Sequence, residues 1–438
     1  THIREVGGSN PSSATSFMKI NFKFFTIITL IIFLAAFLRS YNLTKIYTEY
    51  DDIGVLTLHK FATEDKQIKF DFFGKSKTLI FSKSSINNFE NSLLFPFYIG
   101  YSWTDSPGQY FFHPFITFSK DTYSQKLLKY RSLSVVFSLL TIFVIYFSIT
   151  KIFNSQKNYI TKIFILSSFV FSSTSILYAH HMGPYSVYCL MTAIGVLLCV
   201  NIYNNNISYK KAYLINSFLV YFAYTNILFF ISLLFLQLRK QNLTKLFRYF
   251  FYKNYGYSII YFFLLFPIFL LLYQKKNWNY GSRGVDPEIL TTDSSIYEMF
   301  NLNITQIYLV LKSLFSGFFV FDLIFQNYIV SFFVFFAIIV LIVKNKIYRN
   351  SLFISLLLFI IIWIILFNLS FLPFDQTRHA LILFPVILLL LFMVISSTFN
   401  KYLNIFLFLS FMISIFPSTY NNINLLNTKK SNFDFQLI

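Results

Sequence analysis

Three carboxylates stand close together in the stretch TEYDDIG, as Glu49, Asp51 and Asp52. Carboxylates at this spacing raise one another's proton affinity unless a cation or a substrate relieves their repulsion. Such a group could supply a general base, and Asp51 and Asp52 could also bind a divalent metal ion. A solvated acidic loop is the alternative interpretation.

Two further stretches combine polar side chains with aromatic residues. TDSPGQYFFHPF contains Asp105 and His113, and YAHHMGPYSVY contains His180, His181 and Tyr185. Because neighbouring histidines point in different directions, the pair is only a weak signal for a metal site.

The stretch FDQTRHA places Arg378 and His379 at the expected start of a helix. A guanidinium and the positive end of a helix dipole would together favour a phosphate group there. An interfacial anchor is the alternative role for Arg378. Arg131, which stands where the second long apolar run begins, is predicted to extend toward the membrane interface.

The elements that hold these residues are predicted to be membrane-spanning helices. Hydrophobic residues make up 56% of the 438-residue chain and charged residues 12%, where ordinary soluble domains carry about 25% charge. Long apolar runs match the roughly 20 residues that a helix needs to cross a bilayer, and they lack the alternation of a membrane barrel. We therefore predict an all-α polytopic membrane protein. Its spans are expected at 22–38, 133–150, 163–178, 185–201, 257–273, 328–343, 352–370, 380–397 and 402–417.

Several other classes of protein are disfavoured. The net charge of +19 does not indicate a nucleic-acid partner, because the basic residues are spread over short links rather than gathered on one face. No Gly-rich loop typical of nucleotide binding occurs in the sequence. The predicted spans lack charged residues and histidines well inside them, which argues against ion-coupled transport.

Basic residues in short loops orient the spans, because such loops stay on the cytoplasmic side. Lys19 and Lys23 place the start of the first span inside, so that 39–131 forms a large first outer loop. The apolar run 213–236 would break the rule if it crossed once. We predict instead a short hairpin that turns at 224–226.

The rest of the chain follows the same rule. Residues 306–325 are predicted to form an interfacial helix within an outer loop at 274–327. Counting the hairpin as two, the chain makes about 11 crossings and ends in an outer tail at 419–438. All of the 17 acidic residues except Glu5 then lie outside, together with the histidines named above. Acid and base chemistry is therefore expected on one face only.

Residues 1–17 lack the apolar core of a signal peptide, whereas Met18 precedes a short basic start and an apolar run. We predict that residues 1–17 are not native coding sequence. The membrane domain is accordingly expected to span 18–418.

In their order along the chain, these stretches resemble the motifs of the GT-C superfamily of membrane glycosyltransferases. That group includes the protein O-mannosyltransferases and the aminoarabinose transferase of lipid A. Its members end the first span with Arg and aromatic-Asn-Leu, matched by LRSYNL at 38–43. An aromatic-Asp-acid motif follows, matched by YDD at 50–52, and then a Pro-Leu-Tyr-Tyr-like stretch, matched by SPGQYFF at 106–112.

The later family motifs also have counterparts. RSLS at 131–134 matches Arg-x-x-Ser at the second span, MGPYS at 182–186 matches a turn ending in Arg-x-Tyr-Ser, and Arg378-His379 matches a late Arg-Tyr. The chain departs from the family at three places: Asp52 replaces Glu, Gly183 or Pro184 replaces the Arg before Tyr185, and His379 replaces Tyr. These departures bear on donor binding more than on the fold.

The resemblance implies an inverting transfer of a sugar from a polyprenyl-phosphate donor to an acceptor hydroxyl on a lipid, a glycan or a protein. Asp51 and Asp52 would be catalytic, with Asp51 as the general base, and Arg378 would hold the donor phosphate. A divalent metal ion could act as cofactor. The remaining residues expected to bind substrate are Asp105, His113, His180, His181, Tyr185 and His379.

The implied location is the inner membrane, with the active site on the periplasmic or extracytoplasmic face. A flippase or transporter of lipid-linked sugars is one alternative, which the bare spans disfavour. An O-antigen polymerase-like protein is another, although such proteins usually carry their large outer loop late in the chain. A membrane scaffold without catalytic activity is the third.

Overall fold

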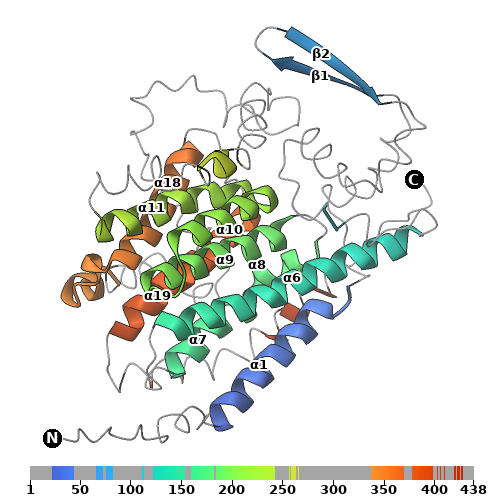
Figure 1. The fold of residues 1–438 in the computed structure, drawn as a ribbon. Coiled ribbons are helices and arrows are strands. Elements are labelled where there is room, and N and C mark those ends of the chain that lie inside the picture. The colour runs from blue at the N-terminus through green and yellow to red at the C-terminus, as the bar shows by residue number, and fades with distance from the viewer. Residues whose placement is uncertain are drawn as a thin grey trace, which may run out of the picture.

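The computed structural model describes residues 22–43, 66–72, 75–81, 111–112, 122–152, 159–181, 184–241, 338–368 and 377–397, with single residues or short groups within 256–265, at 336 and within 402–427. Helices dominate these residues, and Figure 1 shows most of them packed side by side in one bundle. The described part of the chain is thus the helical bundle that the apolar runs predicted.

Two described helices are long and apolar enough to cross a membrane. They are α6 (Tyr123–Ile152), over the stretch Leu127–Ile152, and α9 (Tyr185–Tyr203). Helices α7 (Tyr159–Val170) and α8 (Ser173–Ala179) provide a third crossing if they are counted together. The described residues therefore support two or three crossings, and the total of about 11 stays a prediction.

The pair α7 and α8 is bent by 50°, at a position within the predicted single span 163–178. The side chain of Ser172 accepts a hydrogen bond from Ser175 N at 3.2 Å and so caps the start of α8. Serine hydroxyls compete with helical backbone bonds in this way, which accounts for the break in an otherwise apolar run.

Three further apolar helices coincide with predicted spans. When only residues with described side chains are counted, each of the three is too short to cross a membrane. They are α1 (Phe22–Ser40), α18 (Ser351–Asn368) and α19 (Thr377–Ser397). Helix α9 lies at the centre of the bundle and packs against α6, α10, α11, α18 and α19. The predicted spans 257–273, 328–343 and 402–417 and the interfacial helix at 306–325 lie wholly or largely outside the described residues.

The predicted short hairpin is present. Helices α10 (Tyr209–Phe222) and α11 (Leu228–Lys240) have 14 and 13 residues and are joined by a 3-10 turn, η4 (Tyr224–Ile227). At 1.5 Å per residue each helix is about 20 Å long, which is less than the roughly 30 Å of a hydrocarbon core. The helices run antiparallel, because Tyr209 Oη donates to Leu236 O at 3.1 Å.

One end of the bundle, here called the basic end, is closed by lysines around the last turn of α9. Lys151 Nζ donates to Asn201 Oδ1 at 2.8 Å, and Lys240 Nζ donates to Ile202 O at 2.9 Å. Since Lys240 is the last residue of α11, the hairpin returns the chain to the end at which it began. Lys240 therefore lies at the same end of the bundle as Lys151, and the cytoplasmic location of this end stays a prediction.

Helix α19 runs from the opposite end toward the basic end. Its last residue, Ser397, accepts a hydrogen bond from Asn345 Nδ2 at 3.1 Å, close to the 3-10 turn η8 (Ile347–Arg349). Asn350 Nδ2 in turn donates to Tyr203 Oη at 3.3 Å, at the end of α9. The first turn of α19 consequently points away from the basic end.

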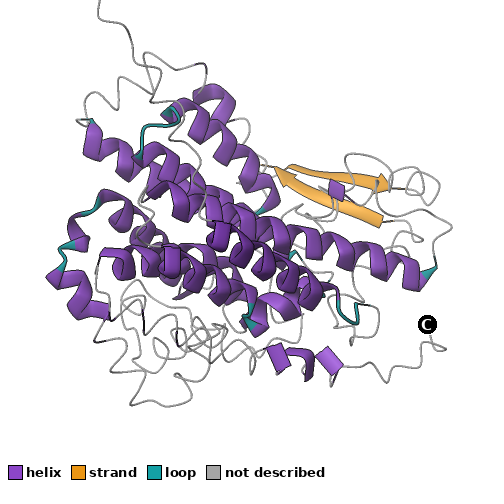
Figure 2. Cartoon of the chain, turned by 90° about the horizontal axis from the view of Figure 1, so that it is seen from below, coloured by secondary structure: helices purple, strands orange, loops and turns teal. Residues whose placement is uncertain are grey.

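A two-stranded antiparallel sheet, which the all-α prediction did not include, falls in the predicted first outer loop. Strand β1 (Lys66–Phe72) pairs with β2 (Lys75–Phe81), with Lys66 opposite Phe81. Figure 1 draws this pair outside the bundle of helices, and Figure 2, with helices in purple and strands in orange, shows how little of the described chain is strand.

Candidate functional site

Four of the predicted site residues lie outside the part of the chain that the structure describes: Asp51, Asp52, Asp105 and His113. Their roles stay predictions, including the metal ion proposed for the first two. Arg378 and His379 fall in the first turn of α19, at the helix N-terminus that the sequence predicted. Of the acidic residues, Asp71 in β1 is the one that lies within the described ranges.

The histidine end, defined by Tyr41, His180, His181 and Tyr185, lies opposite the basic end. His180 is fully buried after α8, with Nδ1 at 2.8 Å from Ile176 O and Nε2 at 3.1 Å from Tyr41 O. Its ring therefore lies between the end of α8 and the first residues of the predicted outer loop.

Burial lowers the pKa of His180 to about 4; the two carbonyl contacts raise it, while the charges of Arg131 and Arg39 lower it further. At pH 7 the imidazole is neutral and can donate from only one of its nitrogens. Neutral His180 therefore donates to Ile176 O or to Tyr41 O but not to both, and with this pKa it is not suited to shuttle protons at neutral pH.

His181 turns to a different neighbour, as the sequence predicted for adjacent histidines. Its ring lies 5.0 Å from the ring of Tyr178, and Tyr178 makes an edge contact of 5.5 Å with Tyr185. His181 and Tyr178 are buried, whereas Tyr185 is partly exposed. Of the three rings, only that of Tyr185 is partly accessible, at the start of α9. Among the described residues, no three His, Cys, Asp or Glu side chains gather as a metal site.

Arg131 is fully buried, so the prediction that it extends toward the interface is wrong. Its Nη1 donates to Leu43 O at 2.7 Å. The side chain turns inward because a backbone carbonyl of the returning chain is available as acceptor. Both ends of the predicted first outer loop, near residues 43 and 131, are therefore bonded to each other.

Arg39, the Arg of LRSYNL, is also fully buried and uses all five of its N–H groups. Nε donates to Ser138 Oγ at 2.8 Å, and Nη2 donates to Ser175 Oγ at 2.8 Å and to Phe169 O at 3.4 Å. Nη1 donates to Val170 O at 3.1 Å and to Ala35 O at 3.3 Å. The guanidinium thus joins α1, α6 and the bend between α7 and α8.

The motif SPGQYFF reaches the bundle at its last two residues. The ring of Phe111 lies 5.1 Å from that of Phe222, at the end of α10, and the ring of Phe112 lies 5.2 Å from that of Phe137 in α6. This part of the predicted outer loop therefore packs on the tip of the hairpin. In the sequence, Asp105 and His113 are close to Phe111 and Phe112.

The hairpin itself is fitted against α9. A Cβ atom on Gly195 would lie 2.4 Å from Phe229 Cδ2 and Cε2, so the absence of a side chain lets α11 approach. Asn226 Nδ2 donates to Met191 O at 2.8 Å, and Asn216 Nδ2 donates to Asn226 O at 3.0 Å. The two amides hold the turn η4 to α9 and α10.

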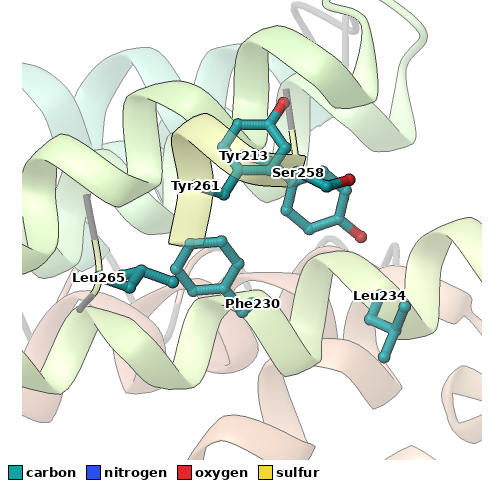
Figure 3. A pocket seen from close by; sticks show the side chains of 6 residues that line it. All are labelled: Tyr213, Phe230, Leu234, Ser258, Tyr261 and Leu265. Atoms are coloured by element: carbon teal, nitrogen blue, oxygen red, sulfur yellow. The ribbon is translucent and has the colours of Figure 1, made fainter. Parts of the chain in front are cut away.

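An apolar cavity of about 360 Å³ lies on the flank of the hairpin and is shown in Figure 3. Two tyrosines in its wall direct their hydroxyls to protein groups: Tyr213 Oη donates to Gln237 Oε1 at 3.0 Å and Tyr261 Oη donates to Lys210 O at 2.9 Å. The remaining wall is formed by Phe230, Leu234, Ser258 and Leu265. The cavity suits a hydrocarbon chain, but it lies near the base of the hairpin, away from the histidine end.

Sequence reasoning assigned no role to Ser138, Ser175 or Asn216, and it included Asn226 only in the predicted turn at 224–226. The signal for the asparagines was present, because an amide in a 24-residue apolar run, 213–236, needs a partner inside the protein. Ser138 and Ser175 gave no such signal, since a serine in a helix can bond to its own backbone.

Comparison with models of known protein families, with curated proteins and with solved structures found no match to this chain.

Proposed function

We propose that this protein is an integral membrane glycosyltransferase that moves a sugar from a polyprenyl-phosphate carrier to an acceptor hydroxyl on the outer face of the membrane. The observation that carries the proposal is the meeting of the motif segments at one end of the bundle. There Arg131 holds Leu43, and His180 contacts Tyr41. Helix α19 begins toward the same end with Arg378.

This arrangement limits the position of Asp51, because only a short length of chain separates Asp51 from Leu43. Asp51 follows Leu43 by eight residues (51 minus 43), and fully extended chain covers at most about 3.5 Å per residue. By chain length alone, the backbone of Asp51 can be at most about 28 Å from the Leu43 carbonyl that Arg131 binds. Tyr41, two residues before Leu43, already contacts His180 at the histidine end, and the partly exposed ring of Tyr185 there can pack against a sugar ring.

In the proposed reaction, Asp51 takes the proton of the acceptor hydroxyl as its oxygen attacks the anomeric carbon. The bond from that carbon to the carrier phosphate breaks, and polyprenyl phosphate leaves with the electron pair. Arg378 stabilises the negative charge that develops on the leaving oxygen. Attack opposite the leaving group inverts the anomeric centre.

The test uses purified protein in lipid nanodiscs and a panel of polyprenyl-phosphate sugars, with release of polyprenyl phosphate as the readout. We expect Asp51→Asn to reduce release by about 100-fold or more, because general-base catalysis contributes on that order. Asp71→Asn in β1 is the matched control, and it should keep wild-type release. Equal activity of Asp51→Asn and wild type would refute the base assignment, and parallel assays with EDTA test the metal ion.

A transporter of lipid-linked sugars is the second candidate. The asparagines buried at the hairpin break favour it, because discontinuous helices with polar groups commonly form transport sites. Movement of a fluorescent lipid-linked sugar across proteoliposomes, with no release of polyprenyl phosphate from any donor, would select this candidate over the transferase.

A further inference from the structure

Four oxygen atoms at the tip of the hairpin are buried and have no hydrogen-bond partner among the described residues. They are Thr192 Oγ1 in α9, Asn216 Oδ1 in α10, and Thr225 Oγ1 and Asn226 Oδ1 in η4. Thr192, Asn216 and Asn226 are 0% exposed, and Thr225 is 9% exposed. Buried polar atoms are nearly always satisfied, so four in one junction indicate a bound group.

Hydrogen bonds already described link the segments that carry these atoms. Asn226 is bonded to Met191, the neighbour of Thr192, and Asn216 is bonded to the backbone of Asn226. The orientation of both amides is fixed, because a carbonyl oxygen can only accept and must therefore face Nδ2. Each Oδ1 is then turned away from the carbonyl that anchors its amide, and it is left as an acceptor.

The chemistry of the four atoms selects the bound group. The two amide oxygens can only accept, whereas the two threonine hydroxyls can donate. One water molecule can donate its two hydrogens to the amide oxygens and accept from the two threonine hydroxyls. Two neighbouring hydroxyl groups of a carbohydrate can do the same. A metal cation would leave both hydroxyl hydrogens without acceptors, and it would bring an unpaired charge into an apolar interior.

We propose that the hairpin tip binds hydroxyl-type oxygen, supplied either by one water molecule or by neighbouring hydroxyl groups of a carbohydrate. Phe111 and Phe112 of the outer-loop motif pack on Phe222 beside the tip, so this motif lies next to the proposed site. The site does not depend on the transferase proposal, since water could occupy it in a protein of any activity.

The first test is the sign of a stability change. A hydroxyl that is buried without a partner destabilises the fold, so an isosteric Thr→Val change would then raise the melting temperature. If the hydroxyl binds a ligand, the same Thr→Val change lowers the melting temperature. We expect Thr192→Val/Thr225→Val to melt roughly 2–4 °C lower than wild type for each hydroxyl lost.

Thr141→Val is the matched control, because Thr141 is equally buried in α6 but bonds its own helix at Phe137 O, at 2.8 Å. Thr225→Ser keeps the hydroxyl and should melt close to wild type. A double variant that melts at or above the Thr141→Val control would overturn the proposal. If the double variant does not fold, the wild-type density map decides: density bridging the four oxygens supports the site, and its absence overturns it.

The second test identifies the source of the hydroxyl. Wild-type protein and Thr225→Val are melted with a panel of methyl glycosides and, separately, with NaCl or KCl against choline chloride. Stabilisation of wild type alone by a glycoside assigns a carbohydrate site, whereas indifference to every glycoside assigns water. Stabilisation by Na⁺ or K⁺ that the variant loses would show a cation site and reject the hydroxyl.

Discussion

The described part of the bundle contains a bend between α7 and α8 and a turn at the hairpin tip, and the backbone groups freed at these two breaks are satisfied in different ways. At the bend between α7 and α8, the carbonyls of Phe169 and Val170 accept from the guanidinium of Arg39. Ser175 Oγ also donates to Phe169 O, at 2.6 Å. At the hairpin tip, the backbone is held by the amides of Asn216 and Asn226 instead.

The two breaks differ in the hydrogen-bonding capacity that remains after the guanidinium or the amides have bonded to the backbone. A guanidinium carries donors only, and the five of Arg39 all find acceptors, so the bend between α7 and α8 is closed to further ligands. An amide that donates to a carbonyl leaves its own oxygen as an acceptor. The hairpin tip is therefore the break that retains binding capacity, and the bend is the one that fixes the fold.

The largest expected effect on stability comes from removing the guanidinium of Arg39. Arg39→Leu should destabilise the protein by on the order of 3–5 kcal/mol, because buried acceptors on α6, α7 and α8 lose their donor together. Thermal loss of the monodisperse peak in size-exclusion chromatography measures this effect. Arg349→Leu, at an exposed arginine of the basic end, is the control and should stay near wild type.

Arg39→Lys separates charge from geometry at the same bend. A lysine supplies three donors from one atom and cannot reach acceptors on both sides of the break as a guanidinium does. We expect it to recover less than half of the stability lost in Arg39→Leu. Full recovery of the stability would mean that a positive charge alone is enough to stabilise the bend.

An intermediate effect is expected where the hairpin meets α9. Gly195→Ala should cost about 1–2 kcal/mol, because the new methyl group displaces the ring of Phe229, which is buried against Phe359 at 4.4 Å. Gly256→Ala is the matched control, since no atom lies within 4 Å of a Cβ there. Thermal melts of both variants give the comparison.

A compensating change tests whether that contact is the cause. Phe229→Leu should lower the cost of Gly195→Ala when the two are combined, as expected for residues in direct contact. Strictly additive effects of the two substitutions would place the damage elsewhere than the contact between α9 and α11.

The smallest expected effect is a pH dependence at the histidine end. The pKa of His180 is about 4 in the folded protein against an ordinary value of 6.5, so protonation favours the unfolded chain. Stability should therefore fall as the pH drops below 6.5, by about 1 kcal/mol between pH 7 and pH 5.5. Melting curves over that range check it. A His180→Gln variant should lose this part of the slope, and an unchanged slope would contradict the assignment.

The sequence predicted the hairpin because charge and length conflicted there. A single crossing at 213–236 would have moved the basic link to the wrong side, and only a turn near 224–226 resolved this. The structure has the turn at Tyr224–Ile227. The differing directions of His180 and His181 followed equally from their adjacency.

Other features could not be predicted, because they depend on contacts between distant segments. The burial of Arg131 requires Leu43 O as its acceptor, and the five bonds of Arg39 require Ser138 and the bend near Val170. Nothing in the local sequence distinguishes such an arginine from an interfacial one. The proposed base Asp51 lies outside the described residues, so its place in the site is argued from sequence and from the length of chain after Leu43.

The short hairpin also sets an order for biogenesis. Neither half can cross a bilayer alone, and its asparagine-bearing tip would be costly in lipid. Helix α9 supplies the carbonyl of Met191 and the notch at Gly195, and it ends at Tyr203, just before the hairpin begins at Tyr209. Because α9 is synthesised immediately before the hairpin, we expect the hairpin to enter the membrane only after α9 is in place to pack against it.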